Sequence, residues 1–415
     1  MEEIRKKLLF TLVILLIFRV GNAIPVPFVN TAALQSYFTS LQNTVLGLLN
    51  VMSGGAFSQA TIFALSIQPY INASIIIQLL CIAIPALERM SKDEGEEGKK
   101  KIASITRYST VAIALLQGFA YYMLIKNNGL LVSDAKNSVW AAIVIVMTFT
   151  AGSALIMWLG EQITEYGIGN GISMILFAGI ISRFPTSIAS TISNVISGNL
   201  KWWVAVLMYL GALAIIVLIV FVNDAERRLP VQYAKRVVGR KMYGGQSTHL
   251  PMKVNMSGVM PIIFAQSIAS LPATIAAMTG HSNSAWARTN TVWYAVLYFA
   301  LIIFFAYFYS TIQFNPIEVA NNLKKNGGYI PGFRPGKPTS EFIQKVLNKI
   351  TLFGAIYLGI LATVPILISV FSKTASLTGL SLGGTSIIIV VGVALETMRA
   401  IEAQLLMRNY KGFLD

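Results

Sequence analysis

Residues 202–222 read Trp202-Trp-Val-Ala-Val-Leu-Met-Tyr-Leu-Gly-Ala-Leu-Ala-Ile-Ile-Val-Leu-Ile-Val-Phe-Val222, with no charged side chain among them. An α-helix needs about 20 apolar residues to cross the hydrocarbon core of a bilayer. Backbone amides inside lipid must form their hydrogen bonds within their own segment, so a run of this kind predicts a helix. This stretch therefore predicts a membrane span, and with it an all-α membrane protein.

The whole chain shares this apolar character. Of its 415 residues, 55% are hydrophobic and 12% are charged, and the mean hydropathy is +0.66. A soluble globular protein carries about 25% charged residues, so the composition excludes an ordinary cytosolic enzyme, a disordered chain and a fibrous repeat. The single cysteine, Cys81, cannot form an intramolecular disulfide, and no paired Cys/His motif predicts zinc. We expect neither a metal nor a cofactor.

Nine further apolar runs bring the number of predicted spans to ten. The runs lie near 8–24, 62–84, 104–125, 139–159, 167–184, 202–222, 256–276, 291–313, 350–371 and 384–407. The first follows a basic cluster as a signal peptide would, but Arg19 interrupts it and no small-residue cleavage site follows, so we expect a span that stays. The second contains Gln68, Asn72 and Gln78, which do not suit lipid on every side.

Basic residues are distributed unevenly between the two sides of this predicted bundle. The N-terminus, the segments 88–107, 223–257 and 313–349, and the C-terminal end from Arg399 hold 25 of the 32 Lys and Arg residues. Ten alternating spans place all these segments on one side of the membrane. Because cytoplasmic loops carry the excess of Lys and Arg, both termini are predicted to be cytoplasmic.

The segment 31–61 lies between two spans and is itself fairly apolar. Its run from Leu46 to Phe57 is too short and too rich in glycine to cross a bilayer. One interpretation is a surface helix lying on the membrane. The other is a segment that folds back into a cavity, where irregular backbone can lie against protein or water.

Several kinds of chemistry are not indicated by the sequence. No pair of carboxylates falls in the middle of a span, as the coupling sites of ion-driven carriers require. The stretch Gly332-Phe-Arg-Pro-Gly336-Lys337 has three residues between its glycines rather than the four of a phosphate-binding loop, and Pro338 follows where Ser or Thr is needed. His249 and His281 stand alone. The sequence does not predict an enzyme.

Two long basic segments, 223–257 and 313–349, stand out on the predicted cytoplasmic side. Short alternation of apolar and polar residues on each side of Gly244-Gly245 predicts a projecting hairpin in the first segment. Positive-inside bias alone would explain the charges, but unbroken loops of this length are usually functional. Arginine pairs well with carboxylate and phosphate, so these loops fit an acidic protein surface or ribosomal RNA.

Six stretches resemble motifs of the bacterial SecY family, which provides the channel subunit of the Sec protein translocase. They are Ile24-Pro-Val-Pro27, Pro69-Tyr-Ile-Asn-Ala-Ser-Ile-Ile-Ile-Gln-Leu79, Trp158-Leu-Gly-Glu-Gln-Ile-Thr164, Gly167-Ile-Gly-Asn-Gly-Ile-Ser173, Gln246-Ser-Thr-His-Leu-Pro251 and Tyr329-Ile-Pro-Gly-Phe-Arg-Pro-Gly336. The resemblance runs in the right order from about residue 4 to the C-terminus.

The resemblance implies ten helices in two inverted, pseudo-symmetric halves of five, which surround a central pore. The N-terminal half is expected over residues 1–184 and the C-terminal half over 185–415. In the family, a ring of aliphatic side chains narrows the pore, and a narrow apolar neck dewets and resists ion leak. The positions that match this ring are Ile71, Ile75, Ile172, Leu176, Ile263 and Ile389. Taken alone, each of them would be read as core packing or a lipid contact.

The family also has a plug, a short helix on the outer side of the ring, and a lateral gate. The stretch 48–64 resembles the plug, and within it we single out Gly54, Gly55, Ala56 and Phe57. Glycines there would allow the plug to be displaced. The lateral gate is expected where the second and third helices meet the seventh and eighth, so that signal sequences and apolar spans can move sideways into lipid.

The resemblance further implies a passive pore whose driving force comes from outside. The expected partners are the SecA ATPase, a translating ribosome, SecE, SecG, signal sequences, unfolded preproteins and membrane lipids, in the plasma (inner) membrane of a bacterium, and no DNA. Docking is expected at Arg334 in the second basic segment. The corresponding residues of the first segment are Arg227, Lys235, Arg236 and Arg240.

Two other classes remain to be weighed against a protein-conducting channel. A secondary transporter for small solutes also uses inverted repeats and breaks in helices at mid-membrane, but the sequence has no charge at that depth. A membrane-embedded protease or lipid transferase would need a catalytic constellation, which the sequence does not show.

Overall fold

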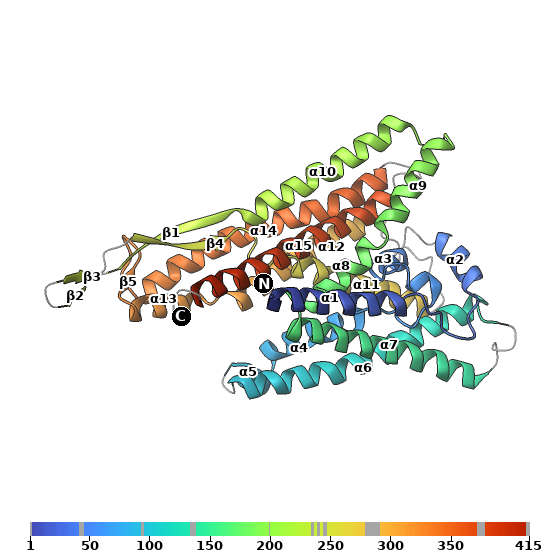
Figure 1. Ribbon diagram of the computed structural model, residues 1–415, viewed down its shortest axis with the longest axis horizontal. Coiled ribbons are helices and arrows are strands. Elements are labelled where there is room, and N and C mark those ends of the chain that lie inside the picture. The colour runs from blue at the N-terminus through green and yellow to red at the C-terminus, as the bar shows by residue number, and fades with distance from the viewer. Residues whose placement is uncertain are drawn as a thin grey trace.

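The computed structural model describes residues 2–40, 45–92, 95–132, 138–198, 200–233, 236–238, 241–243, 247–278, 291–371 and 378–411. Helices dominate these residues, and a small sheet projects from one end (Figure 1). The helices are α1 (Glu2–Gly21), α2 (Thr31–Ser40), α3 (Val45–Met52), the 3-10 turn η1 (Phe57–Gln59), α4 (Gln68–Ala83), α5 (Pro85–Lys92), α6 (Gly95–Asn127), α7 (Val139–Tyr166), α8 (Gly171–Ile181), α9 (Phe184–Ile196), α10 (Trp202–Asp224), α11 (Met260–Met278), α12 (Val292–Gln313), α13 (Pro316–Lys325), α14 (Lys337–Phe371) and α15 (Thr378–Lys411). The strands are β1 (Glu226–Tyr233), β2 (Arg236–Val238), β3 (Lys241–Tyr243), β4 (Ser247–Lys253) and β5 (Gly328–Tyr329).

Each of the ten predicted runs falls on a helix, which confirms the all-α membrane fold. They correspond to α1, α4, α6, α7, α8, α10, α11, α12, α14 and α15. Within the described part of the chain, six helical stretches are long and apolar enough to cross a membrane, the α8–α9 pair counting as one, and α4 and α11 contribute shorter apolar helices. The molecule is therefore a multi-pass membrane protein.

The ten helices form two bundles with the same order of contacts. In the first bundle, α4 contacts α6, α6 contacts α7 and α7 contacts α8, while α1 lies against α7 and α8. In the second bundle, α11 contacts α12, α12 contacts α14 and α14 contacts α15, while α10 lies against α15. If all five helices of the first bundle cross the membrane, as the sequence predicts, the second bundle has the opposite orientation, because an odd number of crossings ends on the other side.

The second predicted span begins later than the hydropathy indicates. The run was expected over 62–84, but α4 begins only at Gln68. The residues before it form a series of turns instead, and the amide of Ile62 donates to the carbonyl of Ile24 over 3.0 Å. A methyl group added at Gly152 of α7 would lie 2.0 Å from the Ile62 carbonyl oxygen, so α7 admits this backbone only because it has no side chain there.

The fifth predicted span is also shorter than expected, because its glycine-rich start forms a loop. Helix α8 begins at Gly171 rather than at 167, and the Asn170 side chain caps it by accepting from the amides of Ile172 and Ser173 over 3.1 and 3.4 Å. Gly169 has φ +74°, a left-handed conformation that glycine adopts without a steric penalty. An Asn at the N-cap satisfies the free amides of the first turn.

The two basic segments, the first of which was expected to hold a projecting hairpin, fold together as one unit at the sheet end. Strand β1 pairs antiparallel with β4 on one edge and with β5 on the other, so the two segments share one sheet. Both also contribute to a common apolar core with α14. That core consists of Leu229, Val231, Met252, Leu323, Ile330, Ile343 and Leu347.

The predicted hairpin is present, but its reversal is misplaced in the sequence prediction. Strands β2 and β3 pair with Val238 opposite Lys241, so the chain reverses between these two residues. Gly244 and Gly245, around which we centred the hairpin, lie outside the described residues.

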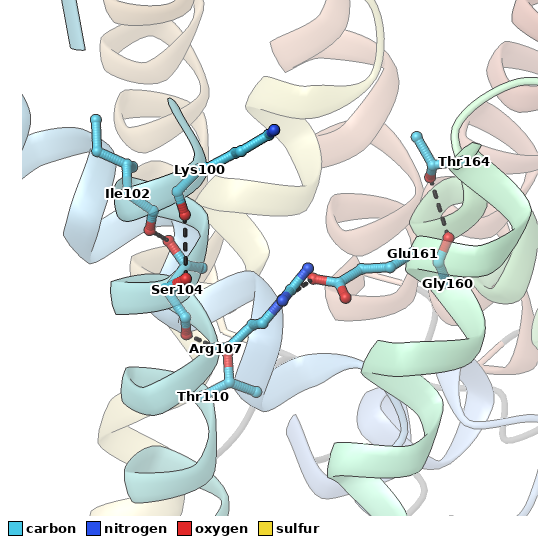
Figure 2. Close-up of polar contacts among 9 residues, drawn as sticks. Lys100, Ile102, Ser104, Arg107, Thr110, Gly160, Glu161 and Thr164 are labelled. Atoms are coloured by element: carbon cyan, nitrogen blue, oxygen red, sulfur yellow. Dashed lines mark hydrogen bonds and ion pairs between the residues drawn. The ribbon is translucent and has the colours of Figure 1, made fainter. Parts of the chain in front are cut away.

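An ion pair joins two helices of the first bundle near the sheet end. Figure 2 shows Arg107 of α6 reaching Glu161 of α7, with Nε and Oε1 2.8 Å apart. The hydroxyl groups around it bond within their own helices, as Thr164 does to the Gly160 carbonyl over 3.0 Å. Among the contacts drawn, the ion pair alone crosses from one helix to the other.

Candidate functional site

The six ring positions come from four helices and from both bundles. Helix α4 contributes Ile71 and Ile75, α8 contributes Ile172 and Leu176, α11 contributes Ile263, and α15 contributes Ile389. All six lie in, or pack against, one apolar cluster. Five of them are at most 3% exposed, and Ile172 is partly buried. Because this cluster continues into the packing between α12 and α14, burial alone does not distinguish residues of a pore ring from residues of an ordinary core.

The segment 45–60 folds back between the two bundles. Helix α3 contacts α8 of the first bundle and both α11 and α15 of the second. Met52, Ala56 and Phe57 are buried. The structure therefore decides between the two interpretations of this segment in favour of the re-entrant one. Its helical part, Val45–Met52, precedes the four plug residues that we singled out.

Those four plug residues form a tight turn and the start of η1. Gly54 and Gly55 have φ +69° and +91°, conformations that favour glycine. The amide of Gly55 donates to the carbonyl of Asn50 over 2.8 Å, which closes the turn. A methyl group at Gly54 would lie 2.8 Å from the carbonyl oxygen of Gly179 in α8, so the turn lies directly against that helix.

Aromatic rings fix the other side of this segment to the first bundle. Phe57 stacks on Tyr121 of α6, with ring centroids 4.2 Å apart, and meets the edge of Phe38 at 5.3 Å. The Tyr121 hydroxyl donates to the carbonyl oxygen of Phe57. At the opposite end, Arg183 Nη1 donates to the carbonyl oxygen of Asn50 over 3.4 Å. The segment expected to be the plug is thus held by backbone turns, ring stacking and one guanidinium.

The bundles meet along two seams, and the first of them is polar. We call it the front seam: α11 lies there against α4 and α6. The Met52 sulfur accepts hydrogen bonds from Gln68 of α4 over 3.4 Å and from Gln266 of α11 over 2.9 Å. Ser267 of α11 donates to Gln68 Oε1 over 3.4 Å. A plug residue therefore bridges the two bundles.

The other contact between the bundles, which we call the rear seam, lies between α8 and α15. Thr397 of α15 donates to the Met174 sulfur of α8 over 3.3 Å and also bonds to the Val393 carbonyl of its own helix over 2.7 Å. A methyl group added at Gly169, in the loop before α8, would lie 3.5 Å from the Thr397 hydroxyl oxygen.

Of the five residues expected to dock partners, the structure describes Arg227, Arg236 and Arg334, which lie at the sheet end. Arg227 in β1 and Arg334 in the turn after β5 are both exposed. The carbonyl of Arg334 accepts from Thr339 over 2.7 Å, which orders the turn. Lys235 and Arg240 lie outside the described residues, and Arg236 is described only as part of β2.

Charges beside the sheet influence one another. Partial burial and the neighbouring Arg399 guanidinium lower the pKa of Lys253, while Asp224 and Glu396 act against this. Arg399 is held by Asp224, with Nη2 and Oδ1 2.7 Å apart, and by the carbonyl of Asn223. Where the structure describes the chain, no three His, Cys, Asp or Glu side chains are grouped to hold a metal.

Sequence reasoning missed three residues of the front seam, Met52, Gln266 and Ser267. A methionine in an apolar segment reads as core, and its role as an acceptor depends on amides that lie far away in the sequence. A polar residue in an otherwise apolar run was the available signal. We used that signal for Gln68 but not for Gln266, which lies in the run at 256–276.

Together, these features define a class of protein. It is a polytopic helical membrane protein in which a re-entrant segment lies between two five-helix bundles. The chain belongs to the SecY family, whose family model matches residues 61–398. The proteins named protein translocase subunit SecY from Streptomyces scabiei and Mycobacterium tuberculosis H37Rv are similar to it, at 45% identity over 430 residues and 44% over 435. Each alignment covers 99% of this chain and 97% of the relative.

Solved structures with similar folds agree with this assignment. "The structure of a protein conducting channel" matches with a TM-score of 0.69 at 16% identity, and the alignment covers 96% of this chain and 92% of that one. "Sec61 in the Canine ribosome-channel complex from the endoplasmic reticulum" matches with a TM-score of 0.65 at 15% identity and the same coverage. At these identities the likeness concerns the fold.

Proposed function

We propose that this chain is the central subunit of a protein-conducting channel, which moves unfolded secretory proteins across the membrane and releases apolar spans sideways into lipid. One observation carries the proposal: a re-entrant segment from the first bundle fills the space between the bundles and hydrogen-bonds to both. The hydrogen bonds that join this segment to both bundles go to a thioether sulfur, which is a weak acceptor, and this suits a closure that has to leave. The SecY-family membership supports the same function.

The six aliphatic positions form the narrowest part of the pore in this proposal. Aliphatic side chains make no sequence-specific contacts, so an extended chain of any sequence can pass. An apolar constriction also dewets, which keeps ions from leaking at rest. The origin of the six residues on four helices of both bundles supports the assignment. The halves of the channel are residues 1–184 and 185–415, with the chain crossing between them after α8.

The front seam is the lateral gate in this proposal. An apolar segment that enters this gate can move from the channel into the lipid. Its distribution between the two depends on the transfer free energies of its side chains. At the centre of a helix, Leu or Ile favours insertion by a few tenths of a kcal/mol, and Lys or Asp opposes it by about 3 kcal/mol. Over about 20 residues this difference separates membrane spans from secreted chain. The hydrogen bonds across the front seam are few and weak, which supports a seam whose two sides can separate.

The driving force comes from partners that dock on the sheet end, SecA or a translating ribosome. Exposed Arg227 and Arg334 on one joined unit support a single docking surface for acidic protein or RNA phosphate. SecE and SecG are the expected membrane partners. The protein lies in the bacterial plasma membrane with both termini cytoplasmic, which the uneven distribution of Lys and Arg supports.

Reconstitution tests this function. Vesicles containing the purified chain and SecE receive SecA, ATP and a secretory precursor, and protease protection of the precursor measures transport. We expect protection that requires ATP and SecA. Arg334→Glu is expected to abolish it, while Lys126→Glu at the opposite end leaves it unchanged. Uptake of a small solute driven by an ion gradient, without precursor transport, would instead support a secondary transporter.

A further inference from the structure

Helix α9, which connects the two bundles, has one apolar and one polar face. Phe184, Ile188, Ile192 and Ile196 follow one another at intervals of four residues and form a continuous apolar stripe. Their side chains are 44%, 39%, 53% and 81% exposed. No residue of α9 is buried. The stripe is therefore left largely uncovered by the rest of the described protein.

The opposite face of α9 is polar but carries no charge. Its residues are Thr186, Ser187, Ser190, Ser193, Asn194 and Ser197. Several of their hydroxyls donate back to carbonyls of the same helix, as Ser190 does to Ser187 over 2.8 Å and Ser197 to Ser193 over 2.7 Å. Between Arg183 and Lys201 the sequence has no charged residue. A helix that meets its own hydrogen bonds in this way suits a place where water is limited.

Helix α9 lies beside the exposed apolar surface of α10. Figure 1 shows it at the end of the molecule opposite to the sheet, running across the bundle between the ends of α8 and α10. Helix α10 begins with Trp202 and Trp203, which are 70% and 51% exposed, and most of its apolar surface is exposed. Tryptophan is enriched at the boundary between membrane and water. The α9 stripe therefore lies next to an aromatic pair that marks this boundary.

We propose that α9 is an interfacial helix, whose Phe184–Ile196 stripe binds the lipid surface at the boundary between headgroups and acyl chains. An amphipathic helix with one polar and one apolar face lies in the plane of this boundary with its apolar face buried among lipids. Continuity with the lipid-facing side of α10 favours lipid over a protein partner. Because α9 joins α8 to α10, its anchoring fixes the connection between the two bundles to the bilayer.

The test uses fluorescent probes at two positions on opposite faces of α9. Cys81, the single cysteine, is replaced by Ala. Ile192→Cys places a probe on the stripe, and Ser190→Cys is its matched control on the polar face. Both side chains are exposed, so neither substitution removes a core contact. The labelled chain is reconstituted in phosphatidylcholine–phosphatidylglycerol vesicles, and quenching is measured with shallow spin-labelled lipids and with aqueous iodide.

We expect lipid quenching at position 192 to exceed that at position 190 at least threefold, with the opposite order for iodide. Equal quenching of both probes by iodide would overturn the proposal, because the stripe would then lie in water. Shielding of position 192 from both quenchers would also overturn it, since a protein surface would then cover the stripe. The readout requires no transport, so a failure of the proposed channel function is distinguishable from a failure here.

Discussion

The front and rear seams both use a methionine sulfur as a hydrogen-bond acceptor, but they differ in which polar groups keep a partner when the two bundles separate. At the front, the Gln68 and Gln266 amides depend on Met52, which belongs to neither bundle wall, and Gln266 Oε1 has no partner among the described residues. At the rear, the Thr397 hydroxyl keeps its bond to the Val393 carbonyl even without Met174. When the seams open, fewer polar groups are therefore left without a hydrogen bond at the rear seam than at the front seam.

Packing and connectivity reinforce this difference. A cavity of about 50 Å³ lies beside the front seam, between α3, α4, α6 and α11, and such a void reduces dispersion contacts there. At the rear, the chain itself joins α8 to α10 through α9. A seam closed by weak polar bonds next to a void opens more easily than one beside a covalent connection. The front seam is therefore expected to open and the rear seam to act as the hinge.

Locking each seam in turn tests this comparison most severely. In a Cys81→Ala background, Gln68→Cys with Ser267→Cys is oxidised or cross-linked across the front seam, and Met174→Cys with Thr397→Cys across the rear seam. We expect the front lock to reduce precursor transport at least twentyfold, with recovery on reduction. The rear lock is expected to change transport less than twofold. Loss of transport with the rear lock alone would reverse our assignment of gate and hinge.

The six ring residues allow a second comparison of the two seams, because the helices of each seam contribute part of the ring. Ile75→Ser with Ile263→Ser alters the front helices, and Leu176→Ser with Ile389→Ser alters the rear ones. A dewetted neck needs apolar side chains on all sides, so each pair is expected to raise resting ion conductance about tenfold in planar bilayers. Ala295→Ser in α12 is the control. Unchanged conductance of both double variants would show that these residues pack in the protein core and do not line the pore.

Replacing each bridging methionine by leucine keeps its volume but removes the acceptor. A neutral hydrogen bond contributes about 1 kcal/mol, which corresponds to about a fivefold change in an equilibrium. Met52→Leu is expected to raise resting conductance about fivefold, because the plug is less firmly held. Met174→Leu should change it less than twofold, since Thr397 retains its other bond. Equal effects of the two variants would contradict the proposed difference between the seams.

The smallest effect is expected where a polar contact lies within one bundle. Arg107→Gln removes the ion pair with Glu161, whose side chains are 52% and 24% exposed. Ion pairs with this exposure contribute about 0–1 kcal/mol, so transport and resting conductance should change less than twofold. A thermal unfolding scan should show a slightly lower midpoint. A large gain in conductance would mean that α6 moves against α7 when the channel opens.

The sequence was sufficient for the spans, because the free energy of transfer into lipid leaves a signal in the composition of each segment. It was insufficient for the start of α4, since the path of residues 60–67 depends on Ile24 and on Gly152, which lie far away in sequence. The ring positions followed from family resemblance rather than from hydropathy. Strand β5 has two residues, too few to show a pattern, so the joining of the two basic segments could not be predicted.

The joined sheet has a mechanical consequence. Its strands continue into α10 and α11, and its apolar core includes Ile343 and Leu347 of α14, so all its described attachments are to the second bundle. A load applied by a bound motor at either basic segment is therefore carried into one bundle as a lever arm. The first bundle experiences that load only across the two seams, so strain concentrates at the weaker seam.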